Sequence, residues 1–232
     1  MQKKWNIHHI KNSEVVSELQ DTLAVDETIA KLLALRGISN FEEAKTFFRP
    51  SLKTLHDPFL MKGMNIAIER IIKAINDNEK VLIFGDYDVD GTTSVALVYS
   101  FFKKYISEIR YYIPDRYIEG YGISFKSIDY ASENNYSLII ALDCGIKAND
   151  KIDYANSKNI DFIICDHHLP GEEIPNAVAV LDPKQSDCPY PYKELAGCGI
   201  GFKLAQAFCL QNSIDEREVF DYLNHFRNYV IP

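Results

Sequence analysis

The sequence predicts an α/β fold of the doubly wound type: a mainly parallel five-stranded sheet with a helical N-terminal extension. Two observations lead to this prediction. Short apolar runs recur at residues 81–85, 138–142 and 162–165, and helical stretches separate them. Continuous runs of four or five apolar residues are typical of parallel strands that are buried on both faces. Alternation of such strands with helices is typical of a sheet covered by helices on both sides.

The first part of the chain, residues 13–77, is predicted to be helical. Residues 27–35 form an amphipathic stretch, and the segment Arg36-Gly37-Ile38 is a plausible stop. The pair Ser39-Asn40 offers an N-cap for a following helix, whose first turn carries Glu42 and Glu43. Isoleucines then recur on one helical side between residues 65 and 76. We therefore predict a helical N-terminal region at residues 1–78.

The predicted core, residues 79–215, alternates strands with helices. Five strands are expected at 81–85, 110–113, 138–142, 162–165 and 177–181. Helices are expected at about 92–105, 124–134, 148–158 and 202–211, with Ser124 as an N-cap. Residues 216–232 are predicted to form a truncated or divergent tail.

Composition excludes several classes of protein. The 232 residues are 47% hydrophobic and 25% charged, as in ordinary folded domains, and the net charge of −8 argues against a broadly basic nucleic-acid coat. No apolar stretch approaches the roughly 20 residues that span a bilayer, and the N-terminus lacks the apolar core of a secretory signal. Five cysteines without a Cys-x-x-Cys pair predict reduced thiols and a cytoplasmic location.

The most informative segment is Asp86-Tyr87-Asp88-Val89-Asp90-Gly91, which follows the first strand. A calcium-binding EF-hand loop starts in the same way, but it needs a glutamate at its twelfth position, where this chain has Leu97, and a helix before it. A plain turn does not account for three alternate carboxylates, whose mutual repulsion a cation would offset. The segment therefore predicts a metal site.

Two further clusters follow strands, Asp143-Cys144-Gly145 and Asp166-His167-His168. Because ligands bind beyond the carboxyl ends of parallel strands, we expect all three clusters to meet at one sheet edge. One imidazole can bind a metal, the other can face a substrate phosphate, and a carboxylate can fix a histidine tautomer. Ligands without thiolate favour Mn²⁺ or Mg²⁺ over structural zinc. Cys144 and Cys165 are expected to be small apolar fillers, and the pair His8-His9 has neither a preceding strand nor a carboxylate partner.

These motifs together resemble the DHH phosphoesterase superfamily. Segments 113–116 (Ile-Pro-Asp-Arg), 119–122 (Glu-Gly-Tyr-Gly) and 195–199 (Leu-Ala-Gly-Cys-Gly), the last followed by Phe202-Lys203, resemble its RecJ family of bacterial single-stranded-DNA-specific exonucleases. The resemblance covers residues from about 20 to 212. It implies a hydrolase with a two-ion Mn²⁺ or Mg²⁺ site that releases mononucleotides from the 5′ end of single-stranded DNA during recombination and repair. It also implies single-strand-binding protein and repair helicases as partners.

Residue roles are carried over by position. The resemblance implies that His168 and Arg116 hold the scissile phosphate. Alternatively, Arg116 is a surface residue that forms an ion pair with Asp115 or Glu119. The implied metal-binding residues are Asp88, Asp90, Asp143 and His167, with Asp86 beside them. The implied catalytic residues are His168, Arg116 and Asp166, and Tyr121 and Gly122 are implied to join Arg116 and His168 in binding substrate.

The C-terminal segment departs from that family. Tyr229 stands where the family has a carboxylate shortly before a Val-Pro pair, so we expect a truncated copy with an impaired second ion and weak activity.

Two other functions stay open: a DHH-type hydrolase of short oligonucleotides, cyclic dinucleotides or pyrophosphate, and a catalytically dead module that binds DNA or a repair partner. A Rossmann-type nucleotide binder is disfavoured because residues 197–201 lack the Gly-x-Gly-x-x-Gly spacing.

Overall fold

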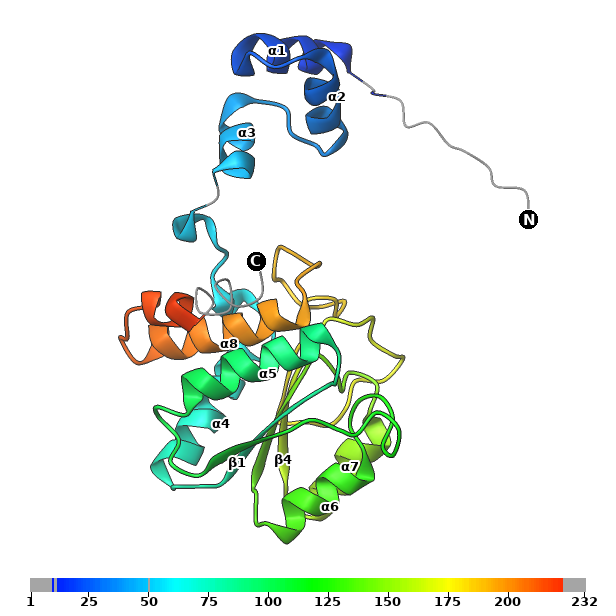
Figure 1. The fold of residues 1–232 in the computed structure, drawn as a ribbon, viewed down its shortest axis with the longest axis vertical. Coiled ribbons are helices and arrows are strands. Elements are labelled where there is room, and N and C mark those ends of the chain that lie inside the picture. Colours follow the sequence, from blue (N-terminus) through cyan, green and yellow to red (C-terminus); the bar gives the residue numbers. More distant parts are fainter. Residues whose placement is uncertain (1–9, 11, 50, 223–232) are drawn as a thin grey trace, which may run out of the picture. The chain divides into compact units, whose positions relative to one another are not determined.

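The computed structural model describes residues 10, 12–49 and 51–222 and divides into two compact units, Met1–Leu55 and His56–Pro232 (Figure 1). The sequence places the corresponding boundary at residue 78. Within the described ranges, no helix is long and apolar enough to cross a bilayer.

The first unit is a small helical bundle. Its described elements are α1 (Ser13–Leu23), α2 (Glu27–Leu35), α3 (Phe41–Phe48) and the short 3₁₀ helix η1 (Leu52–Thr54). Asp26 caps α2, and Asn40 caps α3 by accepting a hydrogen bond from the Glu43 N–H at 3.0 Å. The bundle has its own small core of Val16, Leu19, Ala30, Leu33, Ile38 and Ala44.

The second unit is built on a five-stranded sheet in which every pair of neighbours is parallel, in the order β2-β1-β3-β4-β5. The strands are β1 (Val81–Gly85), β2 (Ile109–Tyr112), β3 (Leu138–Leu142), β4 (Asp161–Cys165) and β5 (Ala179–Leu181). Every residue of β1, β3 and β5 is buried, as expected for strands covered on both faces. The predicted α/β class and five-stranded parallel sheet are confirmed.

Helices cover both faces of this sheet (Figure 1). Val81 and Ile83 point into a core shared with α4 (Met64–Asn76), α5 (Val89–Phe102) and α8 (Gly197–Gln211). Leu82 and Phe84 point the other way, into a core shared with α6 (Phe125–Glu133) and α7 (Asn149–Ser157). The 3₁₀ helix η2 (Pro58–Leu60) lies before α4. The fold is therefore doubly wound, as predicted.

Helix α4 belongs with the sheet, although the sequence groups it with the N-terminal helices. Ile68 and Ile71 are buried in the sheet core. Arg70, whose side chain is 9% exposed, forms ion pairs with Glu79 and Asp161, each at 2.6 Å. The isoleucine row predicts the helix correctly, but periodicity alone does not say which core the helix covers.

Two helices begin earlier than predicted. Helix α5 begins at Val89 instead of Thr92, because the Asp88 carboxylate caps it by accepting the Gly91 N–H at 2.9 Å. Helix α8 begins at Gly197 instead of Phe202, and its first N–H groups are also bound by a carboxylate, that of Asp90. Asp88 and Asp90, which are predicted to be metal ligands, thus also cap the N-terminal ends of helices.

Candidate metal centre

All three predicted clusters lie at the carboxyl edge of the sheet. Asp86 follows β1, Asp143 follows β3, and Asp166 follows β4. Strand β1 has β2 on one side and β3 on the other, so the strand order reverses between β1 and β3. This is the switch point at which doubly wound folds bind ligands.

The three carboxylates after β1 have different environments. Asp86 is fully buried; one oxygen accepts the Gly122 N–H at 3.2 Å, whereas Oδ2 has no hydrogen-bond partner. Burial raises the pKa of Asp86, and the nearby Asp88 raises it further. Asp88 is exposed and caps α5. Asp90 accepts the N–H groups of Gly197 at 2.7 Å and Cys198 at 2.8 Å.

Asp143 lies at the centre of the charge cluster. It is 1% exposed and has a left-handed backbone (φ 61°). Its Oδ1 atom lies 3.1 Å from Nε2 of His167, and the same nitrogen lies 3.7 Å from Oδ2 of Asp90. Burial, followed by the charges of Asp90 and Asp88, raises the pKa of Asp143 to about 8. A buried carboxyl group with a raised pKa is stabilised when it binds either a proton or a cation.

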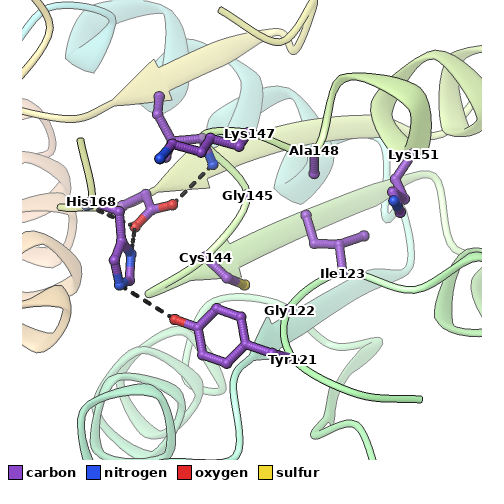
Figure 2. A pocket seen from close by; sticks show the side chains of 11 residues that line it. Tyr121, Gly122, Ile123, Cys144, Gly145, Lys147, Ala148, Lys151 and His168 are labelled. Atoms are coloured by element: carbon purple, nitrogen blue, oxygen red, sulfur yellow. Dashed lines mark hydrogen bonds and ion pairs between the residues drawn. The ribbon is translucent and has the colours of Figure 1, made fainter. Parts of the chain in front are cut away.

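Asp166 orders the loop after β4. Its Oδ1 accepts the His167 N–H at 2.7 Å and lies 2.7 Å from Nδ1 of His168, while Oδ2 accepts the Ile146 N–H at 2.9 Å (Figure 2). Since a carboxylate accepts hydrogen bonds, His168 carries a proton on Nδ1 and directs Nε2 outward. That Nε2 atom lies 3.4 Å from the Tyr121 hydroxyl.

The site has the chemistry that a hard divalent cation needs. Asp143, His167 and His168 offer ligand atoms that lie within 4.8 Å of one another. Buried oxygens of Asp86 and Asp143 lack a hydrogen-bond partner, although His167 approaches Asp143 closely. Carboxylate and imidazole ligands suit Mn²⁺ or Mg²⁺, and a cation would offset the repulsion that raises the Asp143 pKa.

Arg116 lies in the loop between β2 and α6. Its guanidinium carbon lies 5.0 Å from the centre of the Tyr87 ring. Asp115 accepts hydrogen bonds from the N–H groups of Tyr117 and Ile118, and Glu119 binds Tyr112 and Ser124. Among the described residues no carboxylate lies within 4 Å of Arg116, so the alternative of a local ion pair is not observed.

Two buried ionisable groups received no role in the sequence analysis: Asp182, whose pKa is affected by the charges of Asp166 and His168, and Lys203, which lies in α8. Asp182 follows β5 and is fully buried; Oδ1 accepts the Lys184 N–H at 2.7 Å, and burial is the main cause that raises its pKa to about 6. It has the signal that revealed the other clusters, an acid directly after an apolar run. Lys203 is 2% exposed and donates to the His56 carbonyl at 2.6 Å. Burial lowers the pKa of Lys203 to about 8.

The remaining predicted residues divide into three groups. Cys144 and Cys165 are buried and unpaired, as predicted for apolar fillers. Tyr121 and Gly122 lie at the edge of the site, beside His168 and Asp86 respectively. The predictions about Tyr229 and His8-His9 concern residues outside the described ranges.

Asp90→Ala is expected to destabilise the protein even without metal, by about 1–2 kcal/mol, because it leaves two N–H groups of α8 without their acceptor. Urea denaturation in EDTA measures this. Asp153→Ala is the control, because Asp153 is exposed on α7. Equal stability of the two variants would contradict the capping role.

The fold and site define a class: a doubly wound α/β protein with carboxylates and histidines gathered at its switch point. The model of the "DHH family, N-terminal domain" matches residues 80–224. The chain belongs to the DHH family, which confirms the resemblance drawn from the motifs.

Similar proteins are single-stranded-DNA-specific exonucleases. The chain is 41% identical over 204 residues to RecJ of Bacillus subtilis (strain 168), covering 88% of this chain and 26% of that protein. It is 34% identical over 205 residues to RecJ of Escherichia coli (strain K12), covering 88% and 34%. The chain thus spans about a quarter to a third of the length of these relatives.

Solved structures support the fold. The crystal structure of exonuclease RecJ bound to manganese matches with a TM-score of 0.62 and 25% identity, covering 67% of this chain and 40% of that one. RecJ from Thermus thermophilus in complex with Mn²⁺ matches with a TM-score of 0.73 and 22% identity, covering 92% and 30%.

Proposed function

We propose that the chain carries the metal-dependent phosphodiesterase site of a 5′-to-3′ exonuclease that acts on single-stranded DNA. The single observation that carries this proposal is the meeting of Asp86, Asp143 and the Asp166–His168 segment at one sheet edge. The similarity to RecJ exonucleases supports the choice of substrate.

Asp88, Asp90, Asp143 and His167 would hold Mn²⁺ or Mg²⁺, with Asp86 supporting them. Bound ions at such a site would activate water and stabilise the oxygens of an in-line displacement. The proposal is supported by the raised Asp143 pKa and by the similarity to RecJ structures that hold manganese.

His168 would bind the scissile phosphate through Nε2, since Asp166 engages Nδ1 at 2.7 Å. A protonated imidazole can donate to a phosphate oxygen or to the leaving oxygen. Arg116 would hold a second phosphate oxygen, because its planar guanidinium suits phosphate and no carboxylate competes for it among the described residues. Stacking on Tyr87 would keep the guanidinium at the site edge.

Single-stranded DNA labelled at one end or the other tests direction. With Mn²⁺, we expect a 5′ label to appear at once as a mononucleotide, whereas a 3′ label passes through progressively shorter strands. Release from the 3′ end alone would contradict the proposal. Preferred cleavage of a dinucleotide would favour the other DHH hydrolases, and DNA binding without any cleavage would favour the binding module.

His168→Ala is expected to reduce turnover about 10²–10⁴-fold, the usual contribution of a positioned acid or base. The variant should keep its Mn²⁺ affinity within about threefold, because the proposed metal residues remain. Isothermal titration with Mn²⁺ and the cleavage assay together separate the two effects. Unchanged turnover would remove His168 from the proposed chemistry.

Single-strand-binding protein and repair helicases are the proposed partners, and the cytoplasm is the proposed location. The five free cysteines are consistent with a reducing compartment.

A further inference from the structure

Lys203 is a buried cation to which the proposed chemistry gives no role. It lies in α8 and is 2% exposed, and among the described residues no carboxylate lies within 4 Å of its ammonium group. Its Nζ atom donates instead to two uncharged acceptors, the His56 carbonyl at 2.6 Å and Oε1 of Gln206 at 2.7 Å. Because a buried charge without a charged partner is costly, these contacts require an explanation.

The contacts of Lys203 join α8 to the segment through which the chain enters the second unit. That unit begins at His56, whose ring meets the Tyr190 ring edge-on at 5.8 Å between centres. Tyr190 is 1% exposed, lies in the loop that leads from β5 to α8, and has its ring centre 6.0 Å from Nζ of Lys203. Further along the entering segment, the Lys62 N–H donates to Sγ of Cys188 in the same loop at 3.4 Å. The entering segment is therefore anchored at both ends beside the start of α8.

The first turn of α8 has few side chains that could fix its position. Residues 197–201 read Gly-Cys-Gly-Ile-Gly, and glycine has no side chain to pack. A Cβ atom at Gly201 would lie 2.9 Å from Cγ2 of Val98, so the helix backbone lies directly against α5 here. Such a turn keeps its position through its backbone contacts and through the turn that follows it, which contains Lys203.

This first turn in turn positions two of the proposed metal ligands. The N–H groups of Gly197 and Cys198 donate to the Asp90 carboxylate at 2.7 and 2.8 Å. Gly197 also leaves room for Asp143, because a Cβ atom at this glycine would lie 2.6 Å from Oδ1 of that residue. A shift of α8 would therefore displace the Asp90 carboxylate and change the space beside Asp143.

We propose that Lys203 is a positioning residue of the metal centre and acts through α8 by anchoring that helix to the His56 carbonyl. The ammonium group fixes the second turn of α8, and the first turn then presents its N–H groups to Asp90. Lys203 itself touches neither metal nor DNA. This inference rests on the proposed function, which places the ions at Asp90 and Asp143.

Hydrogen exchange of the Gly197 and Cys198 amides, followed by NMR in EDTA, tests the link to Asp90 without requiring metal or hydrolysis. Lys203→Met keeps an unbranched side chain of similar size and removes the ammonium group. We expect both amides to exchange at least about tenfold faster in this variant, because their hydrogen bonds to Asp90 open more often. Ile152→Val is the control: Ile152 is buried on the opposite face of the sheet, so its truncation lowers stability without disturbing α8.

Mn²⁺ titration and the cleavage assay extend the test to the site. Lys203→Met should weaken Mn²⁺ binding at least about tenfold, the usual effect of losing a residue that orients metal ligands, and should lower kcat. The KM for single-stranded DNA at saturating Mn²⁺ should stay within about twofold, since the buried Lys203 does not contact the strand. Ile152→Val should leave all three quantities unchanged. Gln206→Met, which removes one of the two acceptors of the ammonium group, should cause smaller changes in the same direction as Lys203→Met.

The outcomes separate this inference from the proposed function. Faster exchange in Lys203→Met, in a chain that binds no Mn²⁺, would support the link from Lys203 to Asp90 while counting against the proposed activity. In a chain that binds Mn²⁺, unchanged affinity in Lys203→Met would overturn the inference and leave the proposed function standing. Equal effects of Lys203→Met and Ile152→Val would also overturn it, because Lys203 would then contribute only to stability. If Lys203→Met does not fold, Gln206→Met decides, and unchanged exchange of both amides in that variant would overturn the inference.

Discussion

Asp143→Asn is expected to raise the stability of the metal-free protein at pH 8 by about 1–3 kcal/mol, since a buried charge that lacks compensation is costly. The folded pKa of Asp143, about 8, lies above its ordinary value of 3.8. As pH rises from about 4 to 8, the unfolded chain therefore loses this proton before the folded chain does, and stability falls. Asparagine has no proton to lose, and it tolerates the left-handed backbone at this position (φ 61°).

Urea denaturation in EDTA at pH 5 and pH 8 measures this effect, with the exposed Asp153→Asn as control. The advantage of Asp143→Asn should be larger at pH 8. With Mn²⁺ the order should reverse, because an ion at about 100 times its Kd stabilises the wild-type chain by about 2.7 kcal/mol and the variant lacks a ligand. A variant that is less stable at pH 8 in EDTA would contradict the electrostatic description of Asp143.

Gly197→Ala is expected to destabilise the protein by about 1–3 kcal/mol and to weaken Mn²⁺ binding at least about tenfold. A Cβ atom at residue 197 would lie 2.6 Å from Oδ1 of Asp143 and 2.7 Å from its Cβ. To relieve this contact, α8 must move away from the sheet edge. The movement would also disturb the hydrogen bond from the Gly197 N–H to Asp90.

Gly199→Ala is the matched control, because it adds the same methyl group in the same helix. Its Cβ would meet only the flexible Leu195 side chain, at 3.3 Å, and alanine favours the helix by up to about 1 kcal/mol. Urea denaturation and Mn²⁺ titration of both variants provide the comparison. If Gly197→Ala behaved like Gly199→Ala, the close approach of α8 to Asp143 would not matter for the site.

The sheet and the gathering of the site can be predicted from the sequence because both depend on local patterns. Each buried strand is an uninterrupted apolar run, and parallel strands deliver the residues after them to one edge. These two rules are enough to bring Asp86, Asp143 and Asp166 together. Asp182 carries the same signal, but it is easily overlooked because one acid before a proline also resembles a turn.

Other features depend on contacts between distant segments. The Asp90 carboxylate that caps α8 lies 107 positions before Gly197 in the sequence. Because local patterns do not reveal so distant a cap, the sequence does not predict that the helix starts at Gly197. Lys203 has a polar side chain, and its burial depends on the His56 carbonyl and Gln206 as hydrogen-bond partners. Helix α4 shows the same limit: its apolar face is visible in the sequence, but the core that it covers is not.

Anomalous X-ray scattering from a crystal of this chain grown with Mn²⁺ tests the central claim most directly. We expect a manganese peak within bonding distance of the Asp143 carboxylate and the His167 imidazole, with further carboxylate ligands from the segment after β1. The peak should be absent in Asp143→Asn crystals. A well-ordered site without manganese at saturating Mn²⁺, or manganese bound only elsewhere, would contradict a metal centre at this sheet edge.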